Sequence, residues 1–280
     1  IGINHNGKFQ NAIKLIDEAK KAGADIVKFQ IFEPSLLATS YARKAIYQKK
    51  NTRDNEKQIS MLKKYTLTNY EHIKLLKYCN SKKIIYSASV FDIKSADFLL
   101  SLNIPVIKIP SGEITNYPLI KILTKFNGEL ILSTGMSKID EVSNCIDLIC
   151  RNGFPKKRLT LLYCCSSYPA PAEDVDINIM INLKKKFRLK VGISDHSDFL
   201  ESAQAAASNG AAVIEKHFTL NRNSQGPDHK ASFDPKQFKK MVDSVKLINS
   251  IFKSGNKTVK KSEIENRKIS RKSIVAKKKL

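Results

Sequence analysis

The sequence lacks the features that mark membrane-spanning, secreted and nucleotide-binding proteins. It contains no run of about 18 or more apolar side chains, so we expect no membrane span. The chain opens on Ile1 with neither a basic segment nor an apolar core segment, so we expect no signal peptide. It does not start with Met, and we interpret it as a fragment of a longer protein. It also has no Walker A loop and no GxGxxG or GxSxG motif.

Cysteine is scarce, and the cysteines form no metal or redox motif. Cys79, Cys145, Cys150, Cys164 and Cys165 are odd in number and lack CxxC spacing, which predicts reduced thiols in a cytoplasmic protein. We interpret the adjacent Cys164 and Cys165 as small residues at the end of a strand, with a redox-active pair as the alternative.

Acidic residues are also few, since 26 Asp and Glu against 49 Lys and Arg leave a net charge of +23. Such a charge favours a nucleic-acid partner. However, eleven Lys or Arg and two Glu after residue 252 account for +9 of it, and the other lysines are scattered without interleaved aromatic residues. We therefore expect no nucleic-acid partner, and a basic pocket for a phosphorylated, acidic small molecule fits the charge equally well.

Apolar residues make up 42% of the chain, enough for a sizeable core, and they recur in a regular pattern. Extended apolar runs alternate with helix-like segments, and the runs are residues 1–4, 26–30, 84–90, 106–110, 130–134, 159–165, 190–194 and 213–218. This alternation predicts an α/β fold with a parallel sheet, and eight repeats predict a closed (β/α)8 TIM barrel. A doubly wound open sheet is the alternative.

Three segments depart from this pattern. Residues 32–64 form a long polar insert, which is typical of a lid or a binding loop. We assign residues 1–252 to the barrel and residues 253–268, rich in Lys and Ser, to a basic linker. Residues 269–280, which contain the strand-like run SIVA, are predicted to be the start of a second, small domain.

Lysines occur inside two of the apolar runs. Lys28 lies in IVKFQ and Lys108 in VIKIP, and a buried lysine is costly unless an anion pairs with it. Residues at the carboxyl ends of barrel strands line the active site, and several of these ends carry serine. Two ammonium groups among hydroxyls predict a binding site for phosphate and carboxylate. The alternative is that each lysine extends outward to solvent.

The stretch GISDHSD, residues 192–198, brings a histidine to the end of another predicted strand. His196 and His217 are 21 residues apart, one strand–helix–strand step, so they end adjacent strands. Two imidazoles with oxygen donors nearby predict a site for Mn²⁺ rather than structural Zn²⁺. The alternative is that each histidine is an ordinary hydrogen-bonded residue. Ser194, Asp195 and His196 form no nucleophilic triad, because neighbours in a strand point to opposite faces. Asp195 is therefore expected to have a structural role or to support a metal ligand from behind.

Eight motifs occur here in the order found in one known family: IGINHNG, GADIVKFQ, KIPSGEITNYPLI, LILSTGM, YPAP, GISDHS, VIEKHFTL and GPDHKAS. Over nearly its whole length the sequence resembles the sialic acid synthases, the phosphoenolpyruvate-dependent nonulosonate synthases. Within the insert, AIYQK at residues 45–49 resembles the neuraminate and legionaminate branch more than the pseudaminate branch. The terminal SRKSIVAKK resembles the start of that family's small C-terminal SAF (antifreeze-like) domain.

The resemblance implies a (β/α)8 barrel and a transferase reaction in the biosynthesis of sialic or legionaminic acid for surface glycans such as lipopolysaccharide or capsule. Carbon C3 of phosphoenolpyruvate adds to the aldehyde of open-chain N-acetylmannosamine or a related 2,4-diacetamido sugar, water attacks C2, and phosphate leaves with C–O cleavage. A divalent cation, Mn²⁺ with Mg²⁺ or Co²⁺ as alternatives, acts as the Lewis acid. A homodimer swapped through the SAF domain is implied as well.

The resemblance also assigns roles to individual residues. The metal ligands are His196 and His217. The residues that bind phosphoenolpyruvate are Lys28, Ser89, Lys108, Ser111, Ser133, Ser166 and Ser194. The residues that face the sugar are Gln30, Glu113, Tyr168 and Asp228. The catalytic residues are Lys28, Lys108 and Glu113. From the residues alone, GPDH at 226–229 reads as a Gly-Pro turn with Asp228 and His229 in solvent, and it serves the site only if the loop folds back over it.

The sequence departs from the family pattern at several places. The family has a catalytic Glu directly before the position of Ile1. Ser89 and Val90 stand where the family has Thr-Pro, and Tyr163-Cys164-Cys165-Ser166 replaces a segment that begins His-Cys-Thr. The Arg that the SAF domain supplies to the partner's site lies beyond this chain, so we expect little or no activity from these 280 residues alone. Two other functions stay open: a metal- or lysine-dependent barrel aldolase, and a catalytically weakened basic binding protein.

Overall fold

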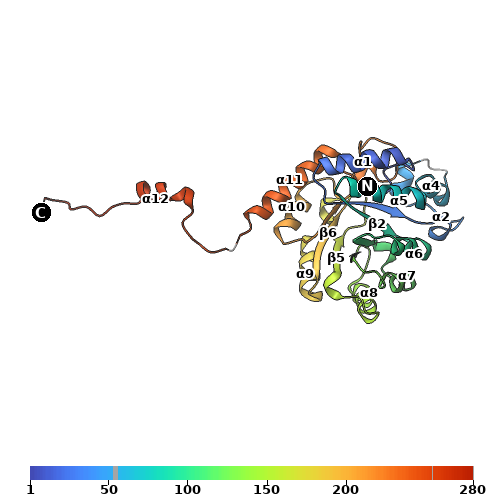
Figure 1. Ribbon diagram of the computed structural model, residues 1–280. Helices are drawn as coiled ribbons and strands as arrows, with labels where there is room; N and C mark the ends of the chain where they lie inside the picture. The colour runs from blue at the N-terminus through green and yellow to red at the C-terminus, as the bar shows by residue number, and fades with distance from the viewer. Residues whose placement is uncertain (53–55, 254, 280) are drawn as a thin grey trace.

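The chain folds around one curled parallel sheet. The computed structural model describes residues 1–52, 56–253 and 255–279, without the side chains of residues 46, 47 and 50. The strands are β1 (Ile26–Ile31), β2 (Ile85–Val90), β3 (Val106–Ile109), β4 (Glu129–Ser133), β5 (Leu159–Cys164), β6 (Lys190–Asp195) and β7 (Ile214–Lys216). They pair in chain order, and helices lie around the outside, which gives a barrel-like shape (Figure 1). The predicted α/β class is confirmed, and this strand order contradicts a doubly wound sheet.

The helices that alternate with the strands are α1 (Phe9–Lys21), α5 (Asn69–Ser81), α6 (Ile93–Ser101), α7 (Tyr117–Leu123), α8 (Ile139–Arg151), α9 (Ile177–Phe187), α10 (Glu201–Ser208) and α11 (Pro235–Ile251). Side chains cap the starts of α5, α6, α7, α9 and α11. Thr68 and Glu71 form a reciprocal capping box at the start of α5, and Asp234 caps α11 through the backbone of Gln237. Gly23 has a φ of 88°, just past the end of α1 as expected from the sequence.

The first expected strand is not part of the sheet. Of residues 1–4, only Gly2 pairs, in a single parallel bridge with Phe29. The chain then turns, because Gly2 and Gly7 have φ angles of 56° and 68°, which a continuing strand does not permit. The prediction of a strand at residues 1–4 is therefore wrong beyond this one bridge.

The N-terminal segment nevertheless contacts both edges of the sheet. Gly2 N donates a hydrogen bond to Lys28 O of β1 at 2.8 Å. Asn4 Nδ2 donates to Phe218 O, two residues past β7, at 2.9 Å. This segment therefore lies across the seam between the first and the last strand.

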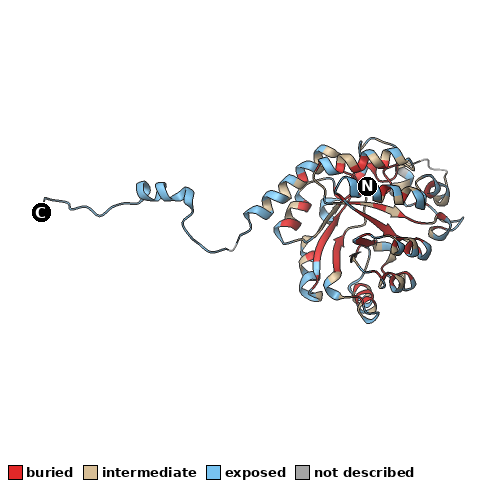
Figure 2. Ribbon diagram, viewed as in Figure 1, coloured by how far each residue is buried: buried red, intermediate tan, exposed pale blue. Residues whose placement is uncertain are grey.

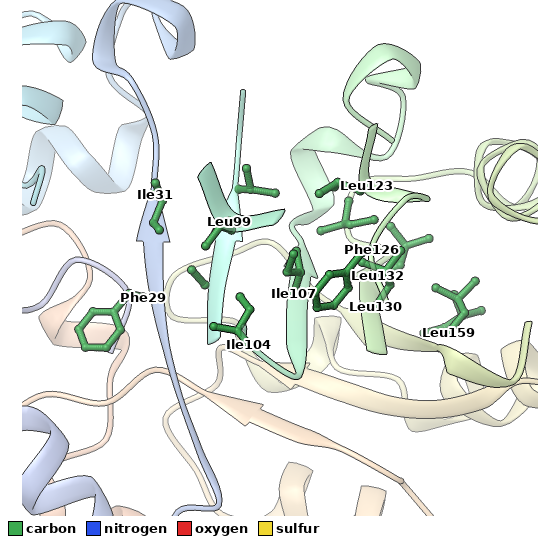
Figure 3. Close-up of a cluster of buried hydrophobic side chains, with 14 of the residues drawn as sticks. Phe29, Ile31, Leu99, Ile104, Ile107, Leu123, Phe126, Leu130, Leu132 and Leu159 are labelled. Atoms are coloured by element: carbon green, nitrogen blue, oxygen red, sulfur yellow. The ribbon is translucent and has the colours of Figure 1, made fainter. Parts of the chain in front are cut away.

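The large core lies between the sheet and the helices. Outward side chains such as Phe29 of β1 and Leu132 of β4 belong to one cluster with buried side chains of the helices, for example Leu15 of α1 and Leu99 of α6. Figure 3 shows Phe29, Leu99 and Leu132 in this cluster. The sheet is buried while the outer faces of the helices are exposed (Figure 2). Burial of these apolar side chains supplies the main driving force for this arrangement.

A second, small cluster lies inside the curled sheet. It brings together Val106, Ile131 and Leu162 of the neighbouring strands β3, β4 and β5, and Ile26 of β1 and Val213 just before β7 pack against them. Side chains two positions apart on a strand point to the same face. The next inward positions on these strands hold Lys28, Lys108, Ser133, Cys164 and Glu215. The apolar cluster thus forms a floor with a polar layer above it.

The insert at residues 32–64 folds against two neighbouring loops. It contains the short helices α2 (Pro34–Leu37), α3 (Ile46–Asn51) and α4 (Gln58–Lys64). Met61 and Leu62 pack against Ile3 and Phe32. Asn51 Nδ2 donates to Pro227 O at 2.9 Å, which ties the insert to the GPDH loop. Its role as a lid stays a prediction, and the side chains of residues 46 and 47 in AIYQK lie outside the described part.

The C-terminal segment runs away from the rest of the chain after α11 (Figure 1). Its described residues are exposed (Figure 2), and it contains a short helix, α12 (Ile264–Ser270), where a linker is predicted up to residue 268. The run SIVA, residues 273–276, forms no strand in the part that the structure describes, because it has no partner for its backbone hydrogen bonds. The domain boundaries stay predictions. None of the described helices has the length and hydrophobicity needed to span a bilayer.

The close packing of Gly192 against the backbone of Val213 allows a test of this fold. A Cβ atom at Gly192 in β6 would collide with Val213 O and lie 3.0 Å from Leu162 Cδ2. We expect Gly192→Ala to lower the free energy of unfolding by about 2 kcal/mol or more, because backbone cannot move aside for it. A Cβ at Gly112 would meet nothing within 4 Å, so Gly112→Ala is the matched control. Equal denaturant midpoints for the two variants would contradict the packing described here.

Candidate active site

The polar layer inside the sheet is organised around three charged side chains, Lys28, Lys108 and Glu215, called here the lysine–glutamate cluster. Lys108 Nζ lies 3.1 Å from Glu215 Oε2, and Lys28 Nζ lies 3.6 Å from Glu215 Oε1. Lys28 also donates to Ser89 Oγ at 3.0 Å, and Ser194 Oγ donates to Glu215 Oε1 at 3.2 Å. The Lys108 side chain is only 3% exposed, so it does not extend outward to solvent.

The charges in this cluster are unequal, with two cations for one anion. Burial lowers the pKa of Lys28, and Glu215 partly opposes that effect. Burial disfavours the charged form of Glu215, but Lys108 and Lys28 outweigh it and hold the pKa of Glu215 well below its usual range. Glu215 is therefore a carboxylate, and the cluster retains an excess of positive charge for a further anion.

Ser133 adds a hydroxyl without a partner. Its side chain is buried, and Oγ has no hydrogen-bond partner among the described residues. A buried polar atom without a partner is costly, and such atoms are concentrated at ligand sites. Ser133 lies two residues beyond Ile131 of the apolar floor, as Lys108 lies two residues beyond Val106, so both belong to the polar layer above that floor.

Two further serines surround the backbone of Gly135. Gly135 N donates to Ser111 Oγ at 3.0 Å. A Cβ atom at Gly135 would collide with Ser166 Oγ and lie 2.9 Å from Ser111 Oγ. Only glycine fits here, and the close approach brings the predicted hydroxyls of Ser111 and Ser166 together. Cys164 Sγ is also close, 3.8 Å from Ser166 Oγ.

The two histidines face each other at the ends of β6 and β7. The ring centroids of His196 and His217 are 5.3 Å apart, at an interplanar angle of 78°. The ring of Tyr168 lies 4.1 Å from that of His196 and 5.7 Å from that of His217. The expectation that both histidines end adjacent strands is therefore met in the structure, and Tyr168 joins them.

These residues fit a divalent cation. His196 Nδ1 lies 2.7 Å from the carbonyl oxygen of Cys165, which can only accept a hydrogen bond, so Nε2 is left as the metal-binding atom. Burial, with His196 and Lys28 nearby, holds the pKa of His217 well below its ordinary value, so this imidazole is neutral, the form that binds metals. His217 Nδ1 has no hydrogen-bond partner among the described residues.

Protein atoms alone would not complete the coordination of a metal here. No three or more His, Cys, Asp or Glu side chains are grouped as a metal site within the described residues. Two imidazole nitrogens therefore leave the remaining positions to water or substrate oxygens, which is the arrangement of an open, catalytic site.

The GPDH loop folds back over the histidines. Asp228 Oδ2 lies 3.6 Å from His217 Nδ1, and burial raises the pKa of Asp228 to about 6. Asp228 and His229 are 5% and 2% exposed, which contradicts a turn with both side chains in solvent. The loop is held by a hydrogen bond of 3.0 Å between His229 Nε2 and Asn6 Oδ1.

Gln30 and Glu113 lie at the edges of this site. A Cβ atom at Gly2 would lie 3.6 Å from Gln30 Nε2, 3.7 Å from His217 Cε1 and 3.9 Å from Asp228 Oδ2, which places Gln30 beside the histidines. Glu113 ends the short 3-10 turn that Ser111 begins, and it accepts a hydrogen bond from Asn116 Nδ2 at 2.8 Å. Burial raises the pKa of Glu113, and the Asn116 hydrogen bond opposes this effect.

Two of the departures from the family pattern can be placed in the structure. After β2, where proline is absent, Asp92 fixes the turn by accepting from Ser95 N at 2.7 Å and from Glu33 N at 2.9 Å. Tyr163 lies in the outer core, and its hydroxyl donates to Asp174 O at 3.1 Å. The side chain at this position is therefore directed away from the polar layer.

Glu215 is the residue that the sequence reasoning missed. It stands in the motif VIEKHFTL, but no role followed from it there. Two patterns could have identified it. It lies two residues before His217, on the same face of the chain, and it follows Ser194 by 21 residues, the spacing that separates the two histidines.

A cavity of about 350 Å³ reaches into the sheet and is lined by Lys28, Lys108, Glu215 and His217, among other residues. A larger hollow of about 490 Å³ lies at the surface between α1 and α11, lined by residues such as Lys21 and Asp243. The inner cavity is the candidate site, because buried ionisable groups with shifted pKa values gather there.

Comparison with known proteins agrees with this geometry. The sequence profile of the NeuB family matches residues 15–257. The chain is 43% identical over 277 residues to the N,N'-diacetyllegionaminic acid synthase of Campylobacter jejuni, covering 99% of this chain and 83% of that protein. It is 40% identical to the enzyme of the same name from Legionella pneumophila, covering 98% and 77%. The crystal structure of N-acetylneuraminic acid (sialic acid) synthetase from Leptospira borgpetersenii superposes with a TM-score of 0.81 at 28% identity, covering 96% and 88%.

The chain therefore belongs to the NeuB family, the sialic acid synthases, which are transferase-type enzymes that make nonulosonic acids.

Removal of the negative charge tests the lysine–glutamate cluster. Glu215→Gln leaves Lys28 and Lys108 buried without a counter-ion, so we expect the free energy of unfolding to fall by about 3 kcal/mol. Added inorganic phosphate should restore more stability to this variant than to the wild type. The control is Glu129→Gln, whose exposed partner Lys190 lies 3.6 Å away and whose loss costs less than about 1 kcal/mol. A stable Glu215→Gln variant indifferent to phosphate would contradict the account.

Ser133 allows a test that separates ligand binding from folding. Because Oγ has no partner in the ligand-free protein, Ser133→Ala should leave thermal stability unchanged or slightly raised while it weakens phosphate binding several-fold. Ser87→Ala is the control, because Ser87 Oγ donates to Val106 O at 3.0 Å and its loss costs about 1 kcal/mol. Calorimetry with and without phosphate measures both effects. Destabilisation by Ser133→Ala with unchanged phosphate affinity would refute this role.

Proposed function

We propose that the protein condenses phosphoenolpyruvate with an N-acetylated amino-sugar, forming a C–C bond and releasing phosphate. The observation that carries the proposal is a cavity lined by two buried lysines and by His217, whose ring faces that of His196. The lysines suit a substrate with two anionic groups, and the histidines suit a cation that binds a carbonyl oxygen. Membership of the NeuB family supports the same reaction.

Phosphoenolpyruvate would bind at the lysine–glutamate cluster. Lys28 and Lys108 take up the charge of the carboxylate and the phosphate, in a site of low exposure where ionic interactions are strong. Hydroxyl donors come from the serines named in the sequence, namely Ser89, Ser111, Ser133, Ser166 and Ser194. Glu215 neutralises part of the lysine charge before the substrate arrives, so the site is stable when empty.

The sugar would lie between the histidines and the GPDH loop. Asp228, Tyr168 and Gln30 lie beside His217 and His196, and Glu113 would reach the sugar from the turn that begins at Ser111. When bound by His196 and His217, a divalent cation, Mn²⁺ with Mg²⁺ or Co²⁺ as alternatives, polarises the aldehyde oxygen of the sugar. The chain's own contribution is to hold the two substrates face to face and to exclude water until the C–C bond has formed.

We also propose the sugar type. The two relatives described above carry the name N,N'-diacetyllegionaminic acid synthase, at 43% and 40% identity. A 2,4-diacetamido-6-deoxymannose-type sugar is therefore proposed ahead of N-acetylmannosamine. The biosynthetic product would serve surface glycans such as lipopolysaccharide or capsule.

The wider organisation is proposed on the same grounds. The segment across the seam between β1 and β7 supports a complete (β/α)8 barrel in the full-length protein. The exposed C-terminal segment would lead to a SAF domain, through which two copies form a swapped homodimer in the cytoplasm. The sequence resemblance supports the SAF domain and the swapped homodimer. The five cysteines without CxxC spacing support the cytoplasmic location.

The function is tested by phosphate release from the full-length protein. We expect release only when phosphoenolpyruvate, a diacetamido or N-acetylated mannosamine sugar and Mn²⁺ are all present. Lys108→Met should abolish release, while Lys240→Met, on the exposed side of α11, should leave it unchanged.

Two outcomes would contradict the proposal. The first is the absence of phosphate release with every sugar of this panel. The second is borohydride trapping of substrate on Lys28 or Lys108, which would instead indicate a Schiff-base aldolase. Burial lowers the pKa of Lys28, a property that such an aldolase also needs, so this control is necessary.

A further inference from the structure

A second buried ion pair lies on the other face of the strands that carry the histidines. Lys216 Nζ is 2.8 Å from Asp195 Oδ2, and the two side chains are 0% and 1% exposed. Asp195 ends β6 and Lys216 ends β7, and they are directly opposite each other in the parallel register. Each residue immediately precedes one of the two facing histidines.

Every polar atom of this pair is engaged. Asp195 Oδ2 also accepts from Ser202 Oγ at 2.7 Å, and Oδ1 accepts from Ser197 N at 2.9 Å. Lys216 Nζ donates a second hydrogen bond to Ser197 O and lies 4.0 Å from the ring centroid of Phe233. The expectation that Asp195 points away from the active site is met.

Stability alone does not account for such a pair. Buried ion pairs can often be replaced by apolar side chains of similar volume without loss of stability, and the best-attested reason to keep one is that it fixes a geometry. The pair Asp195–Lys216 is the last in the register of β6 and β7. Beyond it the histidines follow directly, so this ion pair is the last tie between the two strands in that register.

The backbone carbonyl groups of the two histidines accept hydrogen bonds from other segments of the chain. Ala170 N donates to His196 O at 3.0 Å, and Phe233 N donates to His217 O at 2.9 Å. Neither bond joins one histidine to the other. The backbones of the two histidines, whose ring centroids are 5.3 Å apart, are therefore tied to each other through the strand ends just before them.

We propose that the ion pair of Asp195 and Lys216 is a positioning pair that sets the separation of His196 and His217 and thereby the affinity for the divalent cation. This inference rests on the proposed function, because the separation matters only if the two imidazoles bind one metal. The side chains of Asp195 and Lys216 lie on the opposite face of the strands from Ser194 and Glu215, so the pair acts through the backbone that it ties together.

The test measures metal binding directly. Mn²⁺ affinity is determined by electron paramagnetic resonance for the wild type and for the double variant Asp195→Leu/Lys216→Met, which removes both charges and keeps the volume. We expect the double variant to remain folded with a Kd for Mn²⁺ raised about 10- to 100-fold, the usual effect of losing support behind metal ligands. The visible spectrum of the Co²⁺-loaded protein should change as well, while the affinity for phosphoenolpyruvate should not.

Two further variants complete the design. Lys239→Met/Asp243→Leu removes an exposed pair with the same 2.8 Å separation on α11 and should change none of these readouts. Ser202→Ala removes one hydrogen bond to Asp195 without exposing a charge, and should raise the Kd several-fold even if the double variant fails to fold.

The outcomes separate this inference from the proposed function. If the wild type binds Mn²⁺ and His217→Ala does not, but both the double variant and Ser202→Ala bind it within twofold of wild type with an unchanged Co²⁺ spectrum, the positioning role is refuted and the proposed function stands. If His217→Ala binds Mn²⁺ as tightly as the wild type, the metal site and the positioning role are both refuted.

Discussion

Two ammonium groups inside a curled sheet need an anion, and the arrangement of the site follows from that need. Lys28 and Lys108 stand above an apolar floor, and Glu215 is the anion between them. Because Glu215 partly neutralises the two lysines, the site is stable when it holds no substrate. Because one carboxylate does not balance two ammonium groups, the site still attracts a negatively charged substrate. In the same polar layer, the hydroxyl of Ser133 has no hydrogen-bond partner among the described residues, so it too is left for a ligand.

The period of two along a strand divides chemistry from support. On β6 and β7, Ser194 and Glu215 face inward, while Asp195 and Lys216 face outward as a satisfied ion pair. On β5, Cys164 faces the site while Tyr163 belongs to the outer core. A substitution at an inward position of a strand therefore acts on binding, and one at an outward position acts on stability. The two effects can be measured separately.

Much of the inner layer could be predicted from the sequence, because parallel strands and helices leave a clear pattern. The strand runs predicted Lys28, Lys108 and the two histidines at the ends of the strands. In the structure both lysines and His217 line one cavity, and the ring of His196 faces that of His217. Glu215 was missed because a carboxylate beside a lysine and a histidine in sequence looks like part of a polar strand end. Its lysine partners come from β1 and β3, and only the folded chain brings them to it.

Other features depend on contacts that no local pattern contains. Asp228 reaches His217 only because the GPDH loop is held by Asn6, more than 200 residues earlier, so a turn in solvent was equally compatible with the sequence. The run at residues 1–4 is apolar like a strand, but the left-handed conformation of Gly2 ends its pairing after one bridge. The first case depends on a contact between residues that are distant in sequence, and the second on a backbone angle.

The most direct test of the account is a crystal structure of the protein with phosphoenolpyruvate and Mn²⁺, with anomalous scattering used to locate the manganese. The account predicts phosphate and carboxylate oxygens at Lys28 and Lys108 with Ser133 Oγ now hydrogen-bonded, and one manganese peak between His196 and His217. Phosphoenolpyruvate bound away from both lysines, or manganese bound without the histidines, would contradict it.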